Sequence, residues 1–134
     1  MIALFAMKPL YADAIVEGRK TIEVRRGRIN ASITSMVVYA SKPACVVLGA
    51  VDVERIEVMG AEEFRASIQG DPLEADYLRY VSGHGLRPPA ERVTVLHLAR
   101  PRRLVKPMPL DWFYPGLRAP QMWQGVEFLP PELL

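Results

Sequence analysis

The sequence predicts an α+β fold, a small, mixed and mostly antiparallel β-barrel that carries two or three short helices. Two features of the chain predict it. About six segments have the apolar alternation of strands, and they are interrupted by short stretches with helical spacing. The longest strand pattern changes its apolar phase near Glu54 and Arg55, which indicates a β-bulge of the kind that helps a sheet to curl.

Length and composition are those of one globular domain over residues 1–134. Half of the residues are hydrophobic, and the mean hydropathy is +0.07, so a real core can form. No apolar run reaches the roughly 20 residues that a membrane-spanning helix needs, and the first residues lack the basic start of a signal peptide. We therefore expect a cytoplasmic protein without membrane contact.

Cofactor and metal signatures are missing from the sequence. It contains no Walker or dinucleotide-binding glycine loop, so we expect no cofactor. His84 and His97 occur in unrelated contexts, a loop and a strand, and do not form a metal-ligand pattern. The loop at His84 can present a general base or form a plain turn, and we favour the plain turn. The single cysteine, Cys45, excludes an internal disulfide framework, and its apolar neighbours predict a small buried side chain.

The first part of the chain predicts a strand, a helix and a second strand. Residues 2–8 form the first strand. Pro9 opens the helix, because the missing N–H of proline costs nothing in the first turn. Gly18 ends this helix as a left-handed cap. The second strand covers residues 21–26, and the polar residues 27–35 that follow are predicted to be a loop.

The middle of the chain predicts two further strands and two helices. The strands cover residues 36–41 and 45–58, and Gly49 permits a tight bend in the second. Residues 60–69 form a short helix. Asp71 is the expected N-cap of the next helix, with Pro72 in its first turn, Glu74 completing a capping box and Gly83 ending it. The acidic side chains of both helices are interpreted as a solvated face.

The last part of the chain predicts a strand over residues 92–99, in which His97 is interpreted as a sheet histidine. Residues 100–106 are a basic run whose proline places it on a sheet edge or a connection. The aromatic cluster Trp112, Phe113 and Tyr114 follows. Basic and aromatic side chains together can grip single-stranded nucleic acid. Alternatively the cluster closes the open end of the barrel, which we favour because a small domain needs that apolar area.

Charge is unevenly distributed along the chain. Residues 1–49 carry seven Lys or Arg and three Asp or Glu, and residues 92–134 carry six and three, whereas residues 50–91 carry four and nine. If the two ends of the chain meet, the protein has a basic side and an acidic side. A basic side suits a polyanion, although such asymmetry also serves solubility alone.

The segment from Gly18 to Arg26 concentrates the polar side chains around which the chain is organised. In an extended strand Thr21, Glu23 and Arg25 share one face, while the apolar residues between them share the other. Lys20 sits at the preceding turn and can swing toward Glu23. Spacing alone also fits a solvated strand face whose ion pairs contribute about 0–1 kcal/mol.

Four residues of this segment, Gly18, Lys20, Glu23 and Arg25, match the pattern G-x-K-x-x-E-x-R. With them the chain resembles the ASCH domains, which belong to the PUA-like β-barrel superfamily. Residues 7–15 are similar to the family's entry of strand, Lys-Pro and helix. Residues 39–43 resemble its Y-A-S-x-P strand end, and residues 119–121 its Pro-Pro-Gln-like segment with alanine first. The resemblance covers most of the chain.

The resemblance implies an RNA-binding module whose partner is RNA or a nucleotide or nucleoside. Lys20 and Arg25 are then expected to contact phosphate or a base edge, Glu23 to accept hydrogen bonds from a base, and Tyr39 or Tyr80 to stack. The expected ligand-binding residues are Lys8, Lys20, Thr21, Glu23, Arg25, Arg26, Tyr39, Ser41 and Tyr80.

The resemblance also leaves open a small hydrolase acting on RNA or on a modified nucleoside. Some relatives are amidohydrolases for acetylated cytidine, with a lysine base, a threonine nucleophile and a distal glutamate. This chain carries Glu23 at the threonine position, and Thr21 corresponds to a different threonine, which argues against that activity. Lys20 and Glu23 are the candidate catalytic pair for ribonuclease chemistry, because a buried lysine can act in acid–base catalysis. A regulatory or interaction domain is the third possibility.

Overall fold

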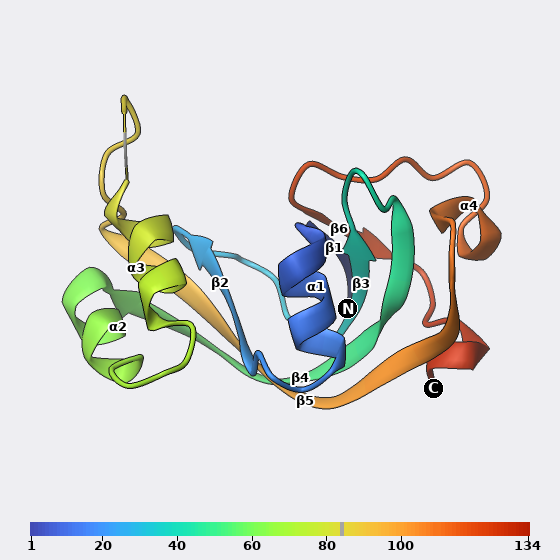
Figure 1. Cartoon of the computed structure of the whole chain (residues 1–134), viewed down its shortest axis with the longest axis horizontal. Coiled ribbons are helices and arrows are strands. Elements are labelled where there is room, and N and C mark those ends of the chain that lie inside the picture. The colour runs from blue at the N-terminus through green and yellow to red at the C-terminus, as the bar shows by residue number, and fades with distance from the viewer. Residues whose placement is uncertain (84) are drawn as a thin grey trace.

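Six strands form one curled sheet in the order β2–β5–β4–β3–β1–β6 (Figure 1). The computed structural model describes residues 1–83 and 85–134, so the predicted turn at His84 lies outside the described residues. Neighbouring strands are antiparallel except for β1 and β3, which are parallel. The bounds are β1 Ile2–Met7, β2 Ile22–Arg26, β3 Ser35–Ala40, β4 Val46–Gly60, β5 Arg92–Met108 and β6 Trp123–Val126.

The mixed, mostly antiparallel α+β architecture predicted from the sequence is confirmed. The sheet differs from a closed barrel, because β2 and β6 stand at its two edges and the strands between them curl into a half-barrel. Four α-helices and one 3-10 helix accompany it, and none of the described helices is long and apolar enough to cross a membrane. They are α1 Pro9–Val16, α2 Ala61–Ser67, α3 Glu74–Ser82, α4 Leu110–Phe113 and η1 Pro131–Leu133.

The two long strands β4 and β5 bend along their length, which curls the sheet, and they span the whole molecule (Figure 1). Their pairing shifts register between Val53 and Arg55, which confirms the bulge predicted there. A second shift occurs at Gly49, where β5 approaches so closely that a Cβ atom would lie 2.0 Å from the carbonyl oxygen of Arg102. Glycine is required here because no side chain fits between the strands.

The helices divide the sheet into two ends and a middle. In Figure 1, α2 and α3 lie at the end that contains β2, α4 and η1 lie at the opposite end, and α1 stands between them. Three apolar clusters follow this division. Phe5 and Leu96 belong to the cluster beneath α1, Phe64 and Val81 to the one beneath α2 and α3, and Leu110 to the C-terminal one.

Two boundary predictions need correction. Helix α3 begins only at Glu74, because the side chains of Asp71 and Glu74 bind backbone N–H groups in the turn before the helix. Asp71 Oδ1 accepts the N–H of Leu73 at 2.8 Å, and Glu74 Oε1 accepts the N–H of Gly70 at 3.0 Å. Strand β5 continues through the basic run to Met108. Its proline is tolerated because β2 pairs only with the first part of β5, so the outer edge is free further on.

The prediction for Cys45 is wrong, whereas the prediction for the aromatic cluster is confirmed in part. Cys45 is exposed, not buried, because the turn after β3 extends through it and β4 begins only at the next residue. In the aromatic cluster Phe113 and Tyr114 are each 7% exposed and pack in the C-terminal core, whereas Trp112 is 65% exposed. The interpretation that this cluster closes one end of the fold is therefore confirmed for two of its three members.

The close approach at Gly49 predicts that Gly49→Ala destabilises the fold by roughly 3 kcal/mol, because the added methyl group must push the backbone of β5 away. Gly60→Ala is the matched control, since a Cβ atom there meets nothing within 4 Å. Guanidinium denaturation followed by circular dichroism would measure both variants. Equal midpoints for the two would contradict the strand packing described above.

Candidate functional site

The turn after α1 directs Lys20 into the protein. Gly18 adopts the predicted left-handed conformation with φ of +78°, and the chain then folds back on α1. The N–H groups of Arg19 and Lys20 both bind the carbonyl oxygen of Ala14, at 2.9 and 3.0 Å. Lys20 is consequently 5% exposed, and Glu23 is 7% exposed. The interpretation of this segment as a solvated strand face is wrong for these two side chains.

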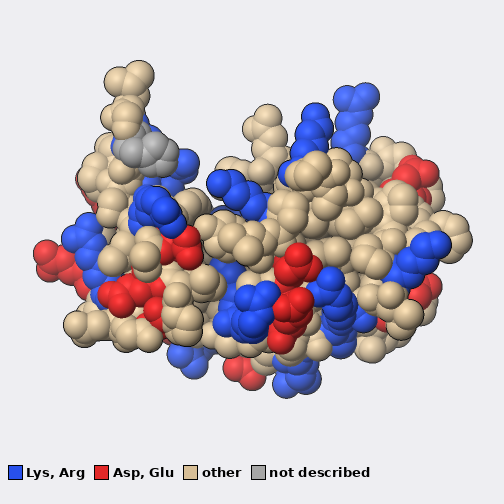
Figure 2. Space-filling model, viewed as in Figure 1, with Lys and Arg blue, Asp and Glu red and all other residues tan. Residues whose placement is uncertain are grey.

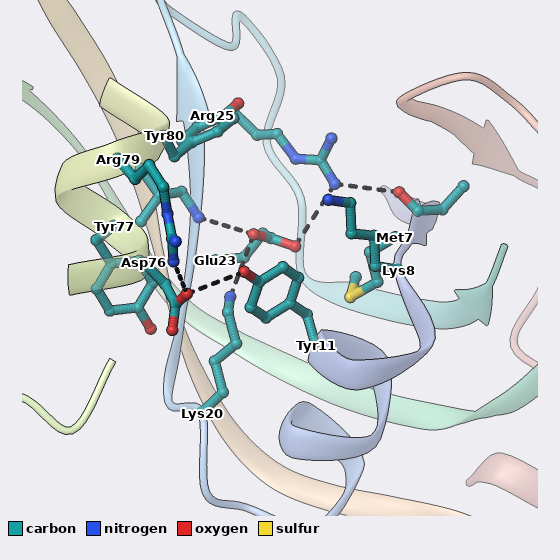
Figure 3. Close-up of a pocket in the computed structure, with 12 residues that line it drawn as sticks. Met7, Lys8, Tyr11, Lys20, Glu23, Arg25, Asp76, Tyr77, Arg79 and Tyr80 are labelled. Atoms are coloured by element: carbon teal, nitrogen blue, oxygen red, sulfur yellow. Dashed lines mark hydrogen bonds and ion pairs between the residues drawn. The ribbon is translucent and has the colours of Figure 1, made fainter. Parts of the chain in front are cut away.

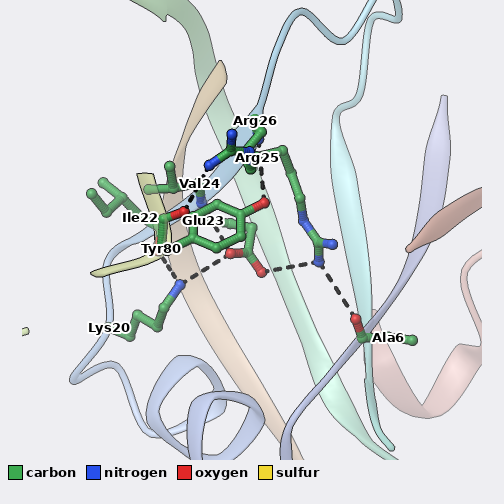
Figure 4. A network of polar contacts seen from close by, with 8 residues as sticks. All are labelled: Ala6, Lys20, Ile22, Glu23, Val24, Arg25, Arg26 and Tyr80. Atoms are coloured by element: carbon green, nitrogen blue, oxygen red, sulfur yellow. Dashed lines mark hydrogen bonds and ion pairs between the residues drawn. The ribbon is translucent and has the colours of Figure 1, made fainter. Parts of the chain in front are cut away.

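Glu23 lies at the centre of a compact ionic cluster (Figure 4). Lys20 Nζ donates to the carbonyl oxygen of Ile22 at 2.6 Å and to Glu23 Oε1 at 3.3 Å. Glu23 Oε1 also accepts the N–H of Val24 at 2.9 Å. The second carboxylate oxygen, Oε2, lies 3.5 Å from Arg25 Nη2.

The surroundings keep Glu23 ionised in the folded protein. Burial by itself raises the pKa of this carboxyl group, but the charges of Lys20 and Arg25 and the N–H of Val24 outweigh burial and lower the pKa. The carboxylate is therefore a permanent hydrogen-bond acceptor at neutral pH.

Arg25 extends from the same strand toward β1. Its guanidinium lies over the ring of Phe5, 4.9 Å from the ring centre, and Nη2 reaches the carbonyl oxygen of Ala6 at 3.5 Å. Among the described residues, the buried Nε atom of Arg25 has no hydrogen-bond partner. Arg25 therefore keeps unused N–H donors, although its side chain is mostly buried.

A cavity of about 410 Å³ opens beside this cluster, between the start of α1, strand β2 and helix α3 (Figure 3). The surface is indented between the α1 side and the α3 side in the space-filling view of Figure 2. Basic, acidic and tyrosine side chains line most of the cavity. They are Lys8, Tyr11, Lys20, Glu23, Arg25, Asp76, Tyr77, Arg79 and Tyr80, with Ala6, Met7 and Val24 between them.

The far wall of the cavity is joined to α1 by a polar contact. The hydroxyl of Tyr11 donates to Asp76 Oδ1 at 3.3 Å, and Arg79 forms an ion pair with the same carboxylate. Burial, followed by the charge of Asp76, raises the pKa of Tyr11. Burial also raises the pKa of Tyr77, whose ring centre lies 5.5 Å from Lys20 Nζ. Both phenols therefore remain protonated donors at neutral pH.

Five of the nine residues expected to bind a ligand line this cavity, and four lie elsewhere. Those at the cavity are Lys8, Lys20, Glu23, Arg25 and Tyr80. Of the others, Thr21 is exposed at the turn before β2, and Ser41 lies in the turn after β3.

Arg26 and Tyr39 contact other parts of the protein and do not line the cavity. Arg26 donates to the carbonyl oxygens of Tyr80 and Val81 at the end of α3, at 3.1 and 3.4 Å. Tyr39 is 7% exposed and packs in the C-terminal core cluster, apart from the residues that line the cavity. Tyr80, the other residue expected to stack on a base, does line the cavity.

Sequence reasoning missed the side chains Tyr11, Asp76, Tyr77 and Arg79. The three from α3 lie within one helical turn, together with Tyr80, so they can face the same region. The sequence contains this spacing, but it does not indicate that α3 packs opposite α1 across β2.

The basic run on β5 is largely neutralised by carboxylates of the chain itself. Arg100 and Arg102 both bind Asp52, at 2.6 and 2.9 Å. Arg103 pairs with Asp13 and Glu17 on α1, at 3.0 and 3.3 Å. Lys or Arg and Asp or Glu side chains both occur on the face shown in Figure 2. The part of the chain that the structure describes contains no cluster of His, Cys, Asp and Glu suited to a metal ion.

The sequence pattern that defines the ASCH domain matches residues 5–108. The chain belongs to the ASCH domain family. Residues 5–108 include the whole cavity lining, from Ala6 to Tyr80. No curated protein sequence matches this ASCH chain significantly.

Solved structures show the same fold. The crystal structure of ASCH from Zymomonas mobilis has a TM-score of 0.77 and 23% sequence identity, and the match covers 94% of this chain and 87% of that one. Two point mutants of that protein give the same TM-score. The N-terminal domain of McrB from Staphylothermus marinus has a TM-score of 0.56 with 10% identity over 87% of this chain and 80% of its own. These likenesses confirm the PUA-like fold.

The depressed pKa of Glu23 predicts a specific loss of stability in acid. Its ionic contribution is fully present above the ordinary glutamate pKa of 4.5 and disappears as the pH falls through the lower pKa of the folded state. The unfolding free energy of the wild type should therefore decline more steeply below pH 4.5 than that of Glu23→Gln, by up to about 1.4 kcal/mol per pH unit.

Urea unfolding between pH 3 and 7, roughly the range of carboxylate titration, would measure this difference. Glu91→Gln serves as the control for removal of a carboxylate, because Glu91 is exposed and forms none of the ion pairs found among the described residues. Parallel pH profiles for the wild type and Glu23→Gln would show that the carboxylate gains nothing from its buried partners.

Proposed function

We propose that this ASCH domain binds RNA or a free nucleotide, and that the ligand occupies the cavity between α1, β2 and α3. The observation that carries the proposal is the lining itself. Four basic side chains, three tyrosines and a buried carboxylate converge on a space of about 410 Å³. Ligand sites are commonly clefts of a few hundred Å³ with a few convergent polar groups.

Each type of lining residue suits one part of a nucleotide. Tyrosine rings offer stacking surfaces for a base, which contribute about 1–3 kcal/mol per base in proteins that bind single strands. Glu23 is an ionised acceptor suited to an exocyclic amino group, and Lys20 and Arg25 supply the complementary donors. A recess of this size favours a base that is free of a duplex, and single-stranded RNA presents such bases.

Hydrolysis of RNA or of a modified nucleoside is the second candidate. The observation that favours it is the combination of the Lys20–Glu23 pair with the protonated hydroxyl of Tyr11 in one cavity. A positioned base and a positioned acid are the elements of general acid–base catalysis. The binding function ranks first, because Glu23 is already engaged by three donors and stands where the amidohydrolase relatives carry their nucleophilic threonine.

Salt-dependent RNA binding would test the proposal. Fluorescence anisotropy of labelled single-stranded and hairpin RNAs should show binding that weakens as salt rises. Arg79→Gln removes an exposed cation at the cavity without disturbing the core, and it should weaken binding and lower the salt slope by about one. Arg118→Gln is the matched control, because Arg118 is exposed and lies outside the cavity.

The same samples, analysed on a denaturing gel, distinguish the two candidates. Intact RNA that binds the wild type and the control, but binds Arg79→Gln more weakly, is the result expected for a binding module. Shortened RNA that disappears with Lys20→Ala would assign the ribonuclease function instead. Equal weakening by Arg79→Gln and Arg118→Gln would overturn the location, because general surface charge would then account for binding.

A further inference from the structure

We propose that Arg25 and Lys8 form an anion subsite within the cavity that binds a phosphate group of the ligand. The inference rests on the proposed function and makes it more specific, because it assigns the site to nucleotides in preference to nucleosides. Three features support it: the incomplete hydrogen bonding of Arg25, the position of Lys8 and the charge balance of the lining.

The guanidinium of Arg25 has more donors than the protein uses. An arginine carries five N–H donors. Both hydrogen bonds of Arg25 come from Nη2, each with a length of 3.5 Å, which is at the weak end of the range. Among the described residues Nε is buried without an acceptor, and Nη1 makes no hydrogen bond.

The position of Arg25 is nevertheless well defined. Its side chain is 11% exposed, and the stacked ring of Phe5 supports one face of the guanidinium. An ordered, planar fork of unsatisfied donors is the geometry that arginine uses to bind a phosphate or carboxylate through two hydrogen bonds. A phosphate group would supply the acceptors that the protein leaves out.

Lys8 comes directly after β1, the strand whose backbone Arg25 contacts. Arg25 donates to the carbonyl oxygen of Ala6, and Lys8 follows two residues later, at the point where β1 ends and α1 begins. Lys8 is exposed and lines the cavity (Figure 3). No residue that the structure describes pairs with the Lys8 ammonium group, so its charge is available to a ligand.

The charge balance of the cavity fits an added anion. Among the described residues the lining contains four cations and two carboxylates. Lys20 and Arg25 both pair with Glu23, and Arg79 pairs with Asp76. The two carboxylates balance two of the four cations, so the lining keeps an excess of two positive charges. A phosphate monoester carries a charge of about −1.5 to −2 at neutral pH, whereas the phosphodiester of an RNA backbone carries −1. A terminal phosphate matches the excess best.

The subsite predicts that a nucleoside monophosphate binds more tightly than its nucleoside. A hydrogen bond to a charged group is worth more than a neutral one, so we expect the phosphate to improve affinity about tenfold or more. Isothermal titration calorimetry would compare the four ribonucleosides, their 5′- and 3′-monophosphates, short RNA without a terminal phosphate, and inorganic phosphate.

Lys8→Gln and Arg25→Lys test the residues. Lys8 is exposed, so Lys8→Gln should fold normally and lose most of the phosphate advantage, which is the ratio of monophosphate affinity to nucleoside affinity. Arg25→Lys retains the charge but removes the planar fork, and it should reduce the advantage as well. Lys42→Gln is the control, because Lys42 is an exposed lysine outside the cavity and its loss should leave the advantage intact.

The possible outcomes separate the subsite from the proposed function. Equal binding of nucleosides and monophosphates, or a phosphate advantage that survives in Lys8→Gln, would overturn the subsite while leaving the cavity as the ligand site. Preference for RNA without a terminal phosphate over every monophosphate would assign the two cations to the backbone and overturn the terminal-phosphate assignment. Absence of binding to every probe would overturn both proposals.

Discussion

The Glu23 carboxylate is nearly out of contact with water, and a buried charge is stable only where opposite charges and hydrogen-bond donors surround it. Three elements supply these groups. The turn after α1 delivers Lys20, β2 contributes the N–H of Val24, and Arg25 extends from β2 to the carbonyl oxygen of Ala6 on β1. Satisfying one carboxylate therefore ties together α1, β2 and β1, which form one wall of the cavity.

The opposite wall depends on the neighbouring residue of the same strand. Arg26 follows Arg25, and its guanidinium binds the carbonyl oxygens of Tyr80 and Val81 at the end of α3, while its N–H binds the Tyr80 hydroxyl. Consecutive residues of a strand point to opposite sides. One arginine thus reaches into the cavity and the next holds the helix that closes it, so five residues of β2 position both walls.

Several features were predictable because they depend on local sequence. Gly18 ends a helix, the phase change near Arg55 marks a bulge, and the Lys20–Glu23–Arg25 spacing concentrates polar groups on one strand and the turn before it. The missed features depend on tertiary packing. Tyr39 alternates into the other core, and the acidic face of α3 includes Asp76, which turns toward the cavity. A helix pattern identifies which residues share a face, but not which element that face meets.

The location of a bound ligand would show whether the ionic cluster of β2 builds the binding cavity. Backbone amide resonances of the ¹⁵N-labelled protein would be followed by NMR during titration with short single-stranded RNA. If the cavity holds the ligand, the shifts should be concentrated at the start of α1, along β2 and on α3. Shifts concentrated instead around the exposed Trp112 of α4, at the opposite end of the sheet, would contradict this location.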